Sequence, residues 1–95
     1  MKPQPLPDDE IARRLAALPH WSREGTEIAR TFDCGNFNGS IAFVDAIARA
    51  ANAADHHPDI AISWNQVTVR LSSHDAHGLT ERDFALAGTI DDLAA

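Results

Sequence analysis

The chain has 95 residues, a formal net charge of -6 with its histidines neutral, and a hydrophobic content of 44%. A chain of this length makes one domain with a modest core, here spanning residues 1–95, and its composition is that of a folded protein. The acidic balance leaves no basic surface to attract phosphates, so we expect no binding to nucleic acid or to an anionic membrane. Cys34 has no partner for an internal disulfide, and the N-terminal stretch lacks an apolar export or membrane segment, which predicts a cytoplasmic protein.

The first third of the chain predicts one helix and two strands. Residues 1–7 contain three prolines and are expected to be flexible. A short amphipathic helix is predicted over 10–18, where apolar residues recur at helical spacing before Pro19. Strands over 20–23 and 27–32, joined by a tight turn, are predicted to pair in antiparallel fashion.

The middle of the chain predicts a long helix over residues 40–54, capped by Asn38 or Ser40. The helix is expected to end before Pro58, because a residue that precedes proline is disfavoured in the α region. This places two adjacent histidines at the helix C-terminus. The residues expected on its inward apolar face are Ile41, Val44, Ile47, Ala48 and Ala51.

The last third predicts a hairpin and a final helix. Ile60, Ile62 and Trp64 alternate in one phase and Val67, Val69 and Leu71 in the opposite phase. A turn is therefore predicted at Asn65-Gln66. Thr80 and Asp83 resemble a capping box that opens a helix, whose apolar side would be Phe84, Ala87, Ile90 and Leu93. The resulting fold class is α+β, a four-stranded antiparallel sheet with three helices on one face, in the order α-β-β-α-β-β-α.

Residues 55–83 hold four of the five histidines and five acidic residues. Histidine exchanges a proton near neutral pH, so a site with His56 or His57 and His74 could keep one imidazole as a base and another as an acid. The predicted hairpin could bring the two polar ends of this stretch together. The acidic residues available to orient the imidazoles are Asp55, Asp59 and Asp75.

Several structural interpretations compete with this chemistry. Adjacent histidines at a helix end are often a solvated cap. His77 is more simply a loop residue, and Asp83 is most simply a helix cap. Trp21 and Trp64 are more often core or interface residues than ligand platforms.

Two chemical rivals are weaker. A metal site could use the clustered histidines, but their spacing matches no well-known zinc motif and there is no second cysteine, so no metal is expected. A nucleophilic mechanism could use Cys34, Ser72 or Ser73. However, Cys34 is far from the histidines in sequence, and neither serine lies in a nucleophile-elbow pattern.

Four motifs in this stretch carry a resemblance to a known family. They read Asp55-His56-His57-Pro58, Trp64-Asn65, Ser73-His74-Asp75 and Gly78-Leu79-Thr80-Glu81-Arg82-Asp83. With these separations the chain closely resembles the pterin-4a-carbinolamine dehydratase family. The match runs over nearly the whole chain and includes Trp21 and Phe37.

The resemblance implies dehydration of 4a-hydroxytetrahydropterin to quinonoid dihydropterin, a recycling step that follows aromatic amino acid hydroxylation, with no cofactor and no metal. It implies that His56, His57 and His74 are catalytic. It also implies a homodimer or homotetramer joined through the sheet and the middle helix. The residues expected to line the pterin site are Asp55, Ser72, Ser73 and Asp75, with Asn52, Trp21 and Asp83 as candidate supporting residues.

The chemistry agrees with such a substrate. Loss of the C4a hydroxyl group needs a proton donor at the oxygen and an acceptor for the N5 proton, which two histidines in different protonation states would supply. The sequence leaves open which histidine is acid and which is base.

One position departs from the family pattern. The family usually has Glu or another ionisable residue four positions before the first histidine, and here that position is Asn52. A carboxylate one helical turn before His56 would stabilise its charged form, whereas an amide only forms hydrogen bonds. The alternative function is therefore a protein-binding or dimerisation module on the same fold with weak or altered catalysis. The family resemblance also implies a dimerisation partner of a transcription factor in animals.

Overall fold

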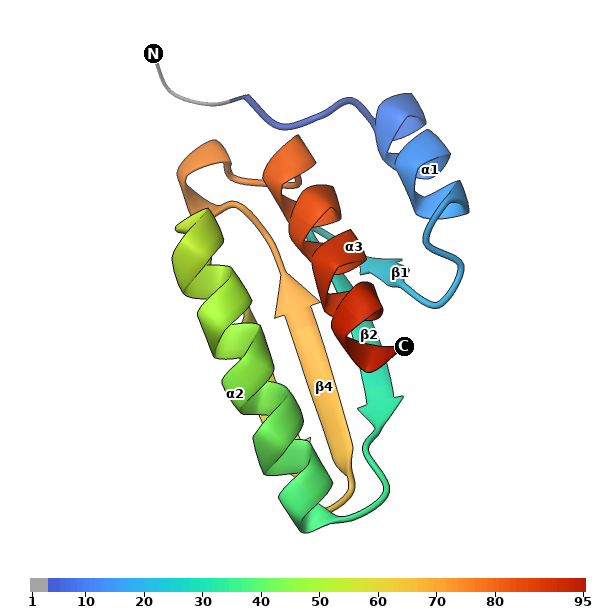
Figure 1. Ribbon diagram of the computed structural model, residues 1–95. Helices are drawn as coiled ribbons and strands as arrows, with labels where there is room; N and C mark the ends of the chain where they lie inside the picture. Colours follow the sequence, from blue (N-terminus) through green and yellow to red (C-terminus); the bar gives the residue numbers. More distant parts are fainter. Residues whose placement is uncertain (1–3) are drawn as a thin grey trace.

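The computed structural model describes residues 4–95 and shows an α+β fold with its elements in the predicted order (Figure 1). The helices are α1 (Asp8–Ala16), α2 (Phe37–Ala54) and α3 (Glu81–Ala94). The strands are β1 (Ser22–Glu24), β2 (Glu27–Asp33), β3 (Asp59–Ser63) and β4 (Gln66–Leu71). A short 3-10 helix, η1 (His74–Ala76), lies between β4 and α3. The predicted fold class is confirmed.

The four strands form one antiparallel sheet in the order β1-β2-β4-β3. The register between the two central strands places Ile28 opposite Leu71 and Phe32 opposite Val67. Side chains alternate between the faces of a strand, so these apolar residues share one face of the sheet. Helices α2 and α3 lie across that face, and α1 packs at its β1 side (Figure 1). The core therefore lies between the helices and one face of the sheet.

The other face of the sheet is polar. Thr31 and Thr68 share a hydrogen bond of 2.9 Å between their hydroxyl oxygens, and Arg70 contacts Glu24 and Glu27. The expectation of a flexible lead falls partly on residues 1–3, which lie outside the described residues. In the described part of the lead, the backbone N–H of Leu6 donates to the carbonyl of Leu79 at 2.8 Å. Within residues 4–95, none of the helices combines the length and apolar character that a membrane crossing requires.

Helix α2 begins three residues earlier than predicted. Asn36 has an extended backbone, and its side-chain oxygen accepts from the backbone N–H of Gly39 at 2.7 Å, so Asn36 is the N-cap. The prediction of Asn38 or Ser40 is wrong. Ser40 is buried, and its hydroxyl donates instead to the carbonyl oxygen of Trp64 at 2.6 Å.

The C-terminal end of α2 sets the direction of the two histidines. Asp55 has a left-handed backbone with φ 49, and its N–H bonds the carbonyl of Asn52. The N–H of His56 bonds the carbonyl of Ala51 at 3.1 Å. These two hydrogen bonds form a Schellman motif, which ends the helix and turns the chain sharply. His56 and His57 therefore lie beyond the helix and not on its surface.

The turn of the β3–β4 hairpin lies one residue earlier than predicted. Ser63 pairs with Gln66, which leaves Trp64 and Asn65 as the turn residues. Trp64 has a positive φ of 50, a conformation that is unusual for a bulky side chain. The Ser40 hydroxyl donates to the carbonyl of Trp64, and the backbone N–H of Cys34 donates to the carbonyl of Asn65 at 2.7 Å. The turn is thus anchored to the start of α2.

Some predicted inward residues are exposed. Ile41 is 39% exposed because the buried line of α2 runs through Ser40, Ile47 and Ala51, and Ile41 lies about 100° around the helix from Ser40. Leu93 is 42% exposed in the last turn of α3, while Leu86 is buried on the side that faces α2. The expectations that Ile41 and Leu93 face the core are therefore wrong. The exposed apolar residues at the start of α2 and along the β3 hairpin are Phe37, Ile41, Ile62 and Trp64.

Candidate active site

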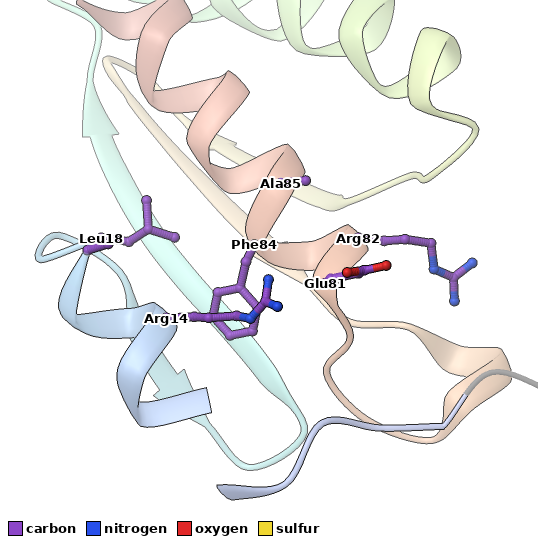
Figure 2. Close-up of a pocket in the computed structure, with 7 residues that line it drawn as sticks. Arg14, Leu18, Glu81, Arg82, Phe84 and Ala85 are labelled. Carbon is purple, nitrogen blue, oxygen red and sulfur yellow. The ribbon is translucent and has the colours of Figure 1, made fainter. Parts of the chain in front are cut away.

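A hollow of about 540 Å³ lies between α1 and α3 and is apart from the predicted site (Figure 2). Its walls include Leu18 and Arg14 from the α1 side and Phe84 and Arg82 from α3. Both guanidinium groups are already engaged, Arg14 with Glu10 at 2.9 Å and Arg82 with Asp75 at 2.6 Å. This hollow contains none of the predicted site residues, and neither of its arginines is free to bind an anionic ligand.

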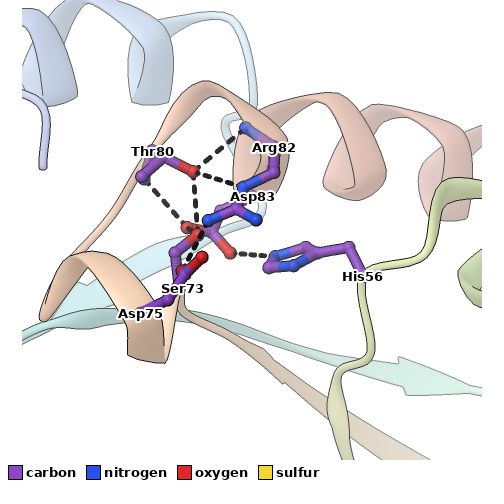
Figure 3. Close-up of polar contacts among 6 residues, drawn as sticks. All are labelled: His56, Ser73, Asp75, Thr80, Arg82 and Asp83. Carbon is purple, nitrogen blue, oxygen red and sulfur yellow. Dashed lines mark hydrogen bonds and ion pairs between the residues drawn. The ribbon is translucent and has the colours of Figure 1, made fainter. Parts of the chain in front are cut away.

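A buried polar cluster at the N-terminus of α3 is the best candidate for chemistry (Figure 3). At its centre is Asp83, which is fully buried. One carboxylate oxygen, Oδ1, lies 2.6 Å from Nε2 of His56. The other, Oδ2, accepts from the Ser73 hydroxyl and from the backbone N–H of Thr80, both at 2.9 Å. Asp83 thus joins a histidine after α2, a serine after β4 and the start of α3.

Local structure explains how these residues meet. The capping box predicted for Thr80 and Asp83 is confirmed, and it directs Oδ2 of Asp83 toward the helix N-terminus. The backbone N–H groups of Ser73 and Gly78 each bond the other residue's carbonyl, which closes the loop after β4. The turn at Asp55 sends His56 toward α3. Every buried side-chain nitrogen or oxygen atom in residues 4–95 has a hydrogen-bond partner.

Asp75 lies at the rim of the cluster and is not part of its buried centre. Arg82 donates to it, and this hydrogen bond holds the pKa of the Asp75 carboxyl below its usual value. The same contact raises the pKa of the Arg82 guanidinium. The two form a charged pair at neutral pH, with side chains 40% exposed at Arg82 and 56% at Asp75. Because the pair is exposed to water, its contribution to stability is small.

His57 has a different partner from His56. Its side chain is exposed, and Nε2 lies 3.0 Å from Oδ1 of Asn52. The expectation that Asn52 acts on His56 is therefore wrong. The physical reason is the left-handed Asp55, which breaks the helical spacing and turns His56 toward Asp83.

Replacing Asn52 by Glu is expected to act on His57 alone. A carboxylate beside Nε2 stabilises the imidazolium, so His57 should stay protonated to a higher pH than in the wild type. Proton NMR titration of the histidine ring signals measures this. The His56 signals should titrate as before, and a change confined to His56 would contradict the assignment.

His74 and His56 line different hollows. His74, with Ser72, Ser73 and His77, borders one of about 390 Å³ beside the β1–β2 turn. His56 borders one of about 450 Å³ between α2 and α3, with Arg82 and several alanines. No hydrogen bond within residues 4–95 joins any two of His56, His57 and His74. The structure therefore brings Ser73, Asp83 and His56 together, and leaves His57 and His74 exposed.

Trp21 lies in the core. It is 5% exposed, its ring packs edge-on against Phe32 with 6.1 Å between centroids, and its Nε1 donates to Asp91 at 2.8 Å. Arg30 binds the same Asp91 oxygen at 2.7 Å. These contacts are with β2 and with the later turns of α3, at the opposite end of that helix from Asp83.

The structure gives little support to the two chemical rivals. Within residues 4–95, no group of three or more histidine, cysteine or acidic side chains is arranged to hold a metal ion. Cys34 precedes α2 and His56 follows it, and a helix of 18 residues is about 27 Å long. Burial raises the pKa of the Cys34 thiol, and the neighbouring Ser40 hydroxyl acts in the opposite direction. A thiol in this state is a poor nucleophile.

Residues 4–93 match the family model described as pterin 4 alpha carbinolamine dehydratase. The chain belongs to this family. A relative from Chloroflexus aurantiacus is 54% identical over 88 residues, which cover 93% of this chain and 95% of the relative. One from Nocardia farcinica is 53% identical over 89 residues, 94% of each chain. Both bear the name "Putative pterin-4-alpha-carbinolamine dehydratase".

Two solved structures resemble this chain. The crystal structure of a transcriptional coactivator/pterin dehydratase from Brucella melitensis has a TM-score of 0.92 and 30% identity, and covers 97% of this chain and 100% of its own. A pterin dehydratase-like protein identified as a RuBisCO assembly factor in the alpha-carboxysome has a TM-score of 0.66 and 24% identity, over 79% of this chain and 87% of its own. At that identity the second match shows a shared fold alone.

Proposed function

We propose that this protein dehydrates 4a-hydroxytetrahydropterin to quinonoid dihydropterin by histidine acid and base catalysis. The observation that carries the proposal is the buried contact between His56 and Asp83 in a member of the pterin dehydratase family. A histidine held by a buried carboxylate is fixed in orientation and supports proton transfer.

The reaction moves two protons. An acid donates a proton to the C4a hydroxyl group, the C4a–O bond breaks and water leaves. A base takes the proton from N5 of the pterin, and the electron pair of the N5–H bond forms the N5–C4a double bond of the quinonoid product. Two histidines in opposite protonation states meet both needs without a redox step.

The three histidines differ in the partner of the ring. Nε2 of His56 faces Asp83 and Nε2 of His57 faces Asn52. We assign one of the two proton transfers to His56, and the other to His57 or His74, which are exposed and accessible to a substrate. Asp55, Ser72 and Asp75 are the residues proposed to line the pterin.

Stopped-flow measurement of 4a-hydroxytetrahydropterin dehydration tests the proposal. The wild type should exceed the uncatalysed rate, and His56→Ala should lower the catalysed rate by about 10²- to 10⁴-fold. A loss of the same size in either His57→Ala or His74→Ala identifies the second proton-transfer group. His20→Ala is the matched control, since His20 is exposed and lies outside the clustered stretch. A wild-type rate equal to the uncatalysed rate would refute the proposal.

A further inference from the structure

We infer that Ser73 is a positioning residue, which fixes the ring of His56 through Asp83 and leaves Nδ1 of His56 as the nitrogen that exchanges a proton with the substrate. The inference rests on the dehydration proposed above and deepens it. It also gives Ser73 a role other than direct contact with the pterin.

The directions of the hydrogen bonds follow from one fact. A carboxylate only accepts, so the Ser73 hydroxyl must donate to Oδ2 of Asp83. Ser73 Oγ lies 2.8 Å from Thr80 Oγ1, and the Ser73 proton is already used, so Thr80 must donate to Ser73. Thr80 Oγ1 in turn accepts from the backbone N–H of Arg82 at 3.3 Å. The chain of donors runs from Arg82 through both hydroxyl groups to the carboxylate.

The same reasoning fixes the tautomer of His56. Because Oδ1 of Asp83 only accepts, Nε2 of His56 must carry a proton at their separation of 2.6 Å. Neutral His56 is therefore the Nε2–H tautomer, and its Nδ1 has no hydrogen-bond partner among residues 4–95. Since one nitrogen is committed to the protein, Nδ1 is the atom left for acid or base chemistry.

Burial argues against a substrate contact for Ser73. Its side chain is 1% exposed, and its hydroxyl proton and one acceptor site are both engaged inside the protein. Its backbone N–H and carbonyl are paired with Gly78. The adjacent Ser72 is only half-buried and has no hydroxyl contact within the described chain. The serine available to a ligand is therefore Ser72.

Positioning predicts a specific effect on catalysis. With the Ser73 hydroxyl removed, Oδ2 of Asp83 keeps only the Thr80 N–H, so the carboxylate and the His56 ring gain rotational freedom. Misplacement of a catalytic group affects the rate of the chemical step more than substrate binding, so Ser73→Ala should lower kcat by about 10- to 100-fold and change KM little.

The experiment combines stopped-flow kinetics with nitrogen-15 NMR of the histidine rings at a pH where His56 is neutral. Wild-type protein should show the proton on Nε2 of His56, and Ser73→Ala should show a mixture of both tautomers. Thr31→Val is the control, because it removes one hydroxyl of a comparable hydroxyl–hydroxyl hydrogen bond on the exposed sheet face. It should leave the kinetics and the His56 signals unchanged.

Each result has a definite meaning. A neutral wild-type His56 with its proton on Nδ1 overturns the inference without any variant. A Ser73→Ala protein whose KM rises while kcat is unchanged makes Ser73 a substrate contact and also overturns it. If the wild type does not dehydrate the pterin but the His56 tautomer responds to Ser73→Ala, the positioning stands and the proposed function fails.

Discussion

Replacing Asp83 by Asn should lower the dehydration kcat by about 10³- to 10⁴-fold, because the substitution inverts the tautomer of a general acid–base histidine. In the wild type, Oδ2 of Asp83 accepts hydrogen bonds from two donors, the Ser73 hydroxyl and the Thr80 N–H. The amide oxygen of Asn must occupy that position, and its NH₂ group is then presented to His56. Nε2 becomes an acceptor, and neutral His56 carries its proton on Nδ1.

Stopped-flow kinetics and circular dichroism together measure this effect. Asn has nearly the shape of Asp and keeps the capping oxygen, so the helical signal should be retained. Asp91→Asn is the matched control on the same helix, since its Oδ1 also accepts from two donors, and it should keep the wild-type kcat. A folded Asp83→Asn protein with kcat within threefold of the wild type would show that His56 does not depend on Asp83.

Replacing Trp21 by Ala is expected to cost about 3–5 kcal/mol of the free energy of unfolding, since it empties the volume of a large buried aromatic side chain. The change removes the edge-on contact with Phe32 and the hydrogen bond to Asp91. Single domains have total free energies of unfolding of roughly 5–15 kcal/mol. For a domain at the lower end of that range, this loss would nearly abolish the stability. Urea denaturation followed by circular dichroism measures it.

Trp21→Phe separates a core role from a role in the site. Phe keeps most of the packing and loses the indole N–H, while Asp91 retains Arg30 as a partner. The expected cost is about 1–2 kcal/mol, with dehydration kinetics unchanged. A Trp21→Phe protein with native stability and a tenfold lower kcat would instead place Trp21 in contact with the pterin.

The order of elements could be predicted from the sequence because the patterns that set it are local. The alternation of Val67, Val69 and Leu71 fixes which side of β4 faces the core, and the register of the sheet agrees with it. The capping box of Thr80 and Asp83 was predictable for the same reason, since both residues lie within one helical turn.

The contact between His56 and Asp83 could not be predicted, because 27 residues separate the two and their meeting depends on how α2 packs against α3. The capping role of Asp83 uses Oδ2 and is enough to explain an aspartate at this position. No local pattern therefore indicated a partner for Oδ1. The error at Asn52 has a local cause. Counting one turn back from His56 assumes that the helix continues, and the left-handed Asp55 ends it first.

The two tryptophans, one in the core and one in the β3–β4 hairpin turn, are optical probes in different surroundings. Of the two tryptophans, Trp21 is 5% exposed and Trp64 is 67% exposed. In the Trp21→Phe protein the remaining indole emission comes from Trp64 alone, whose backbone carbonyl accepts a hydrogen bond from Ser40 at the start of α2. Its fluorescence then reports the solvent around the exposed apolar residues of that region.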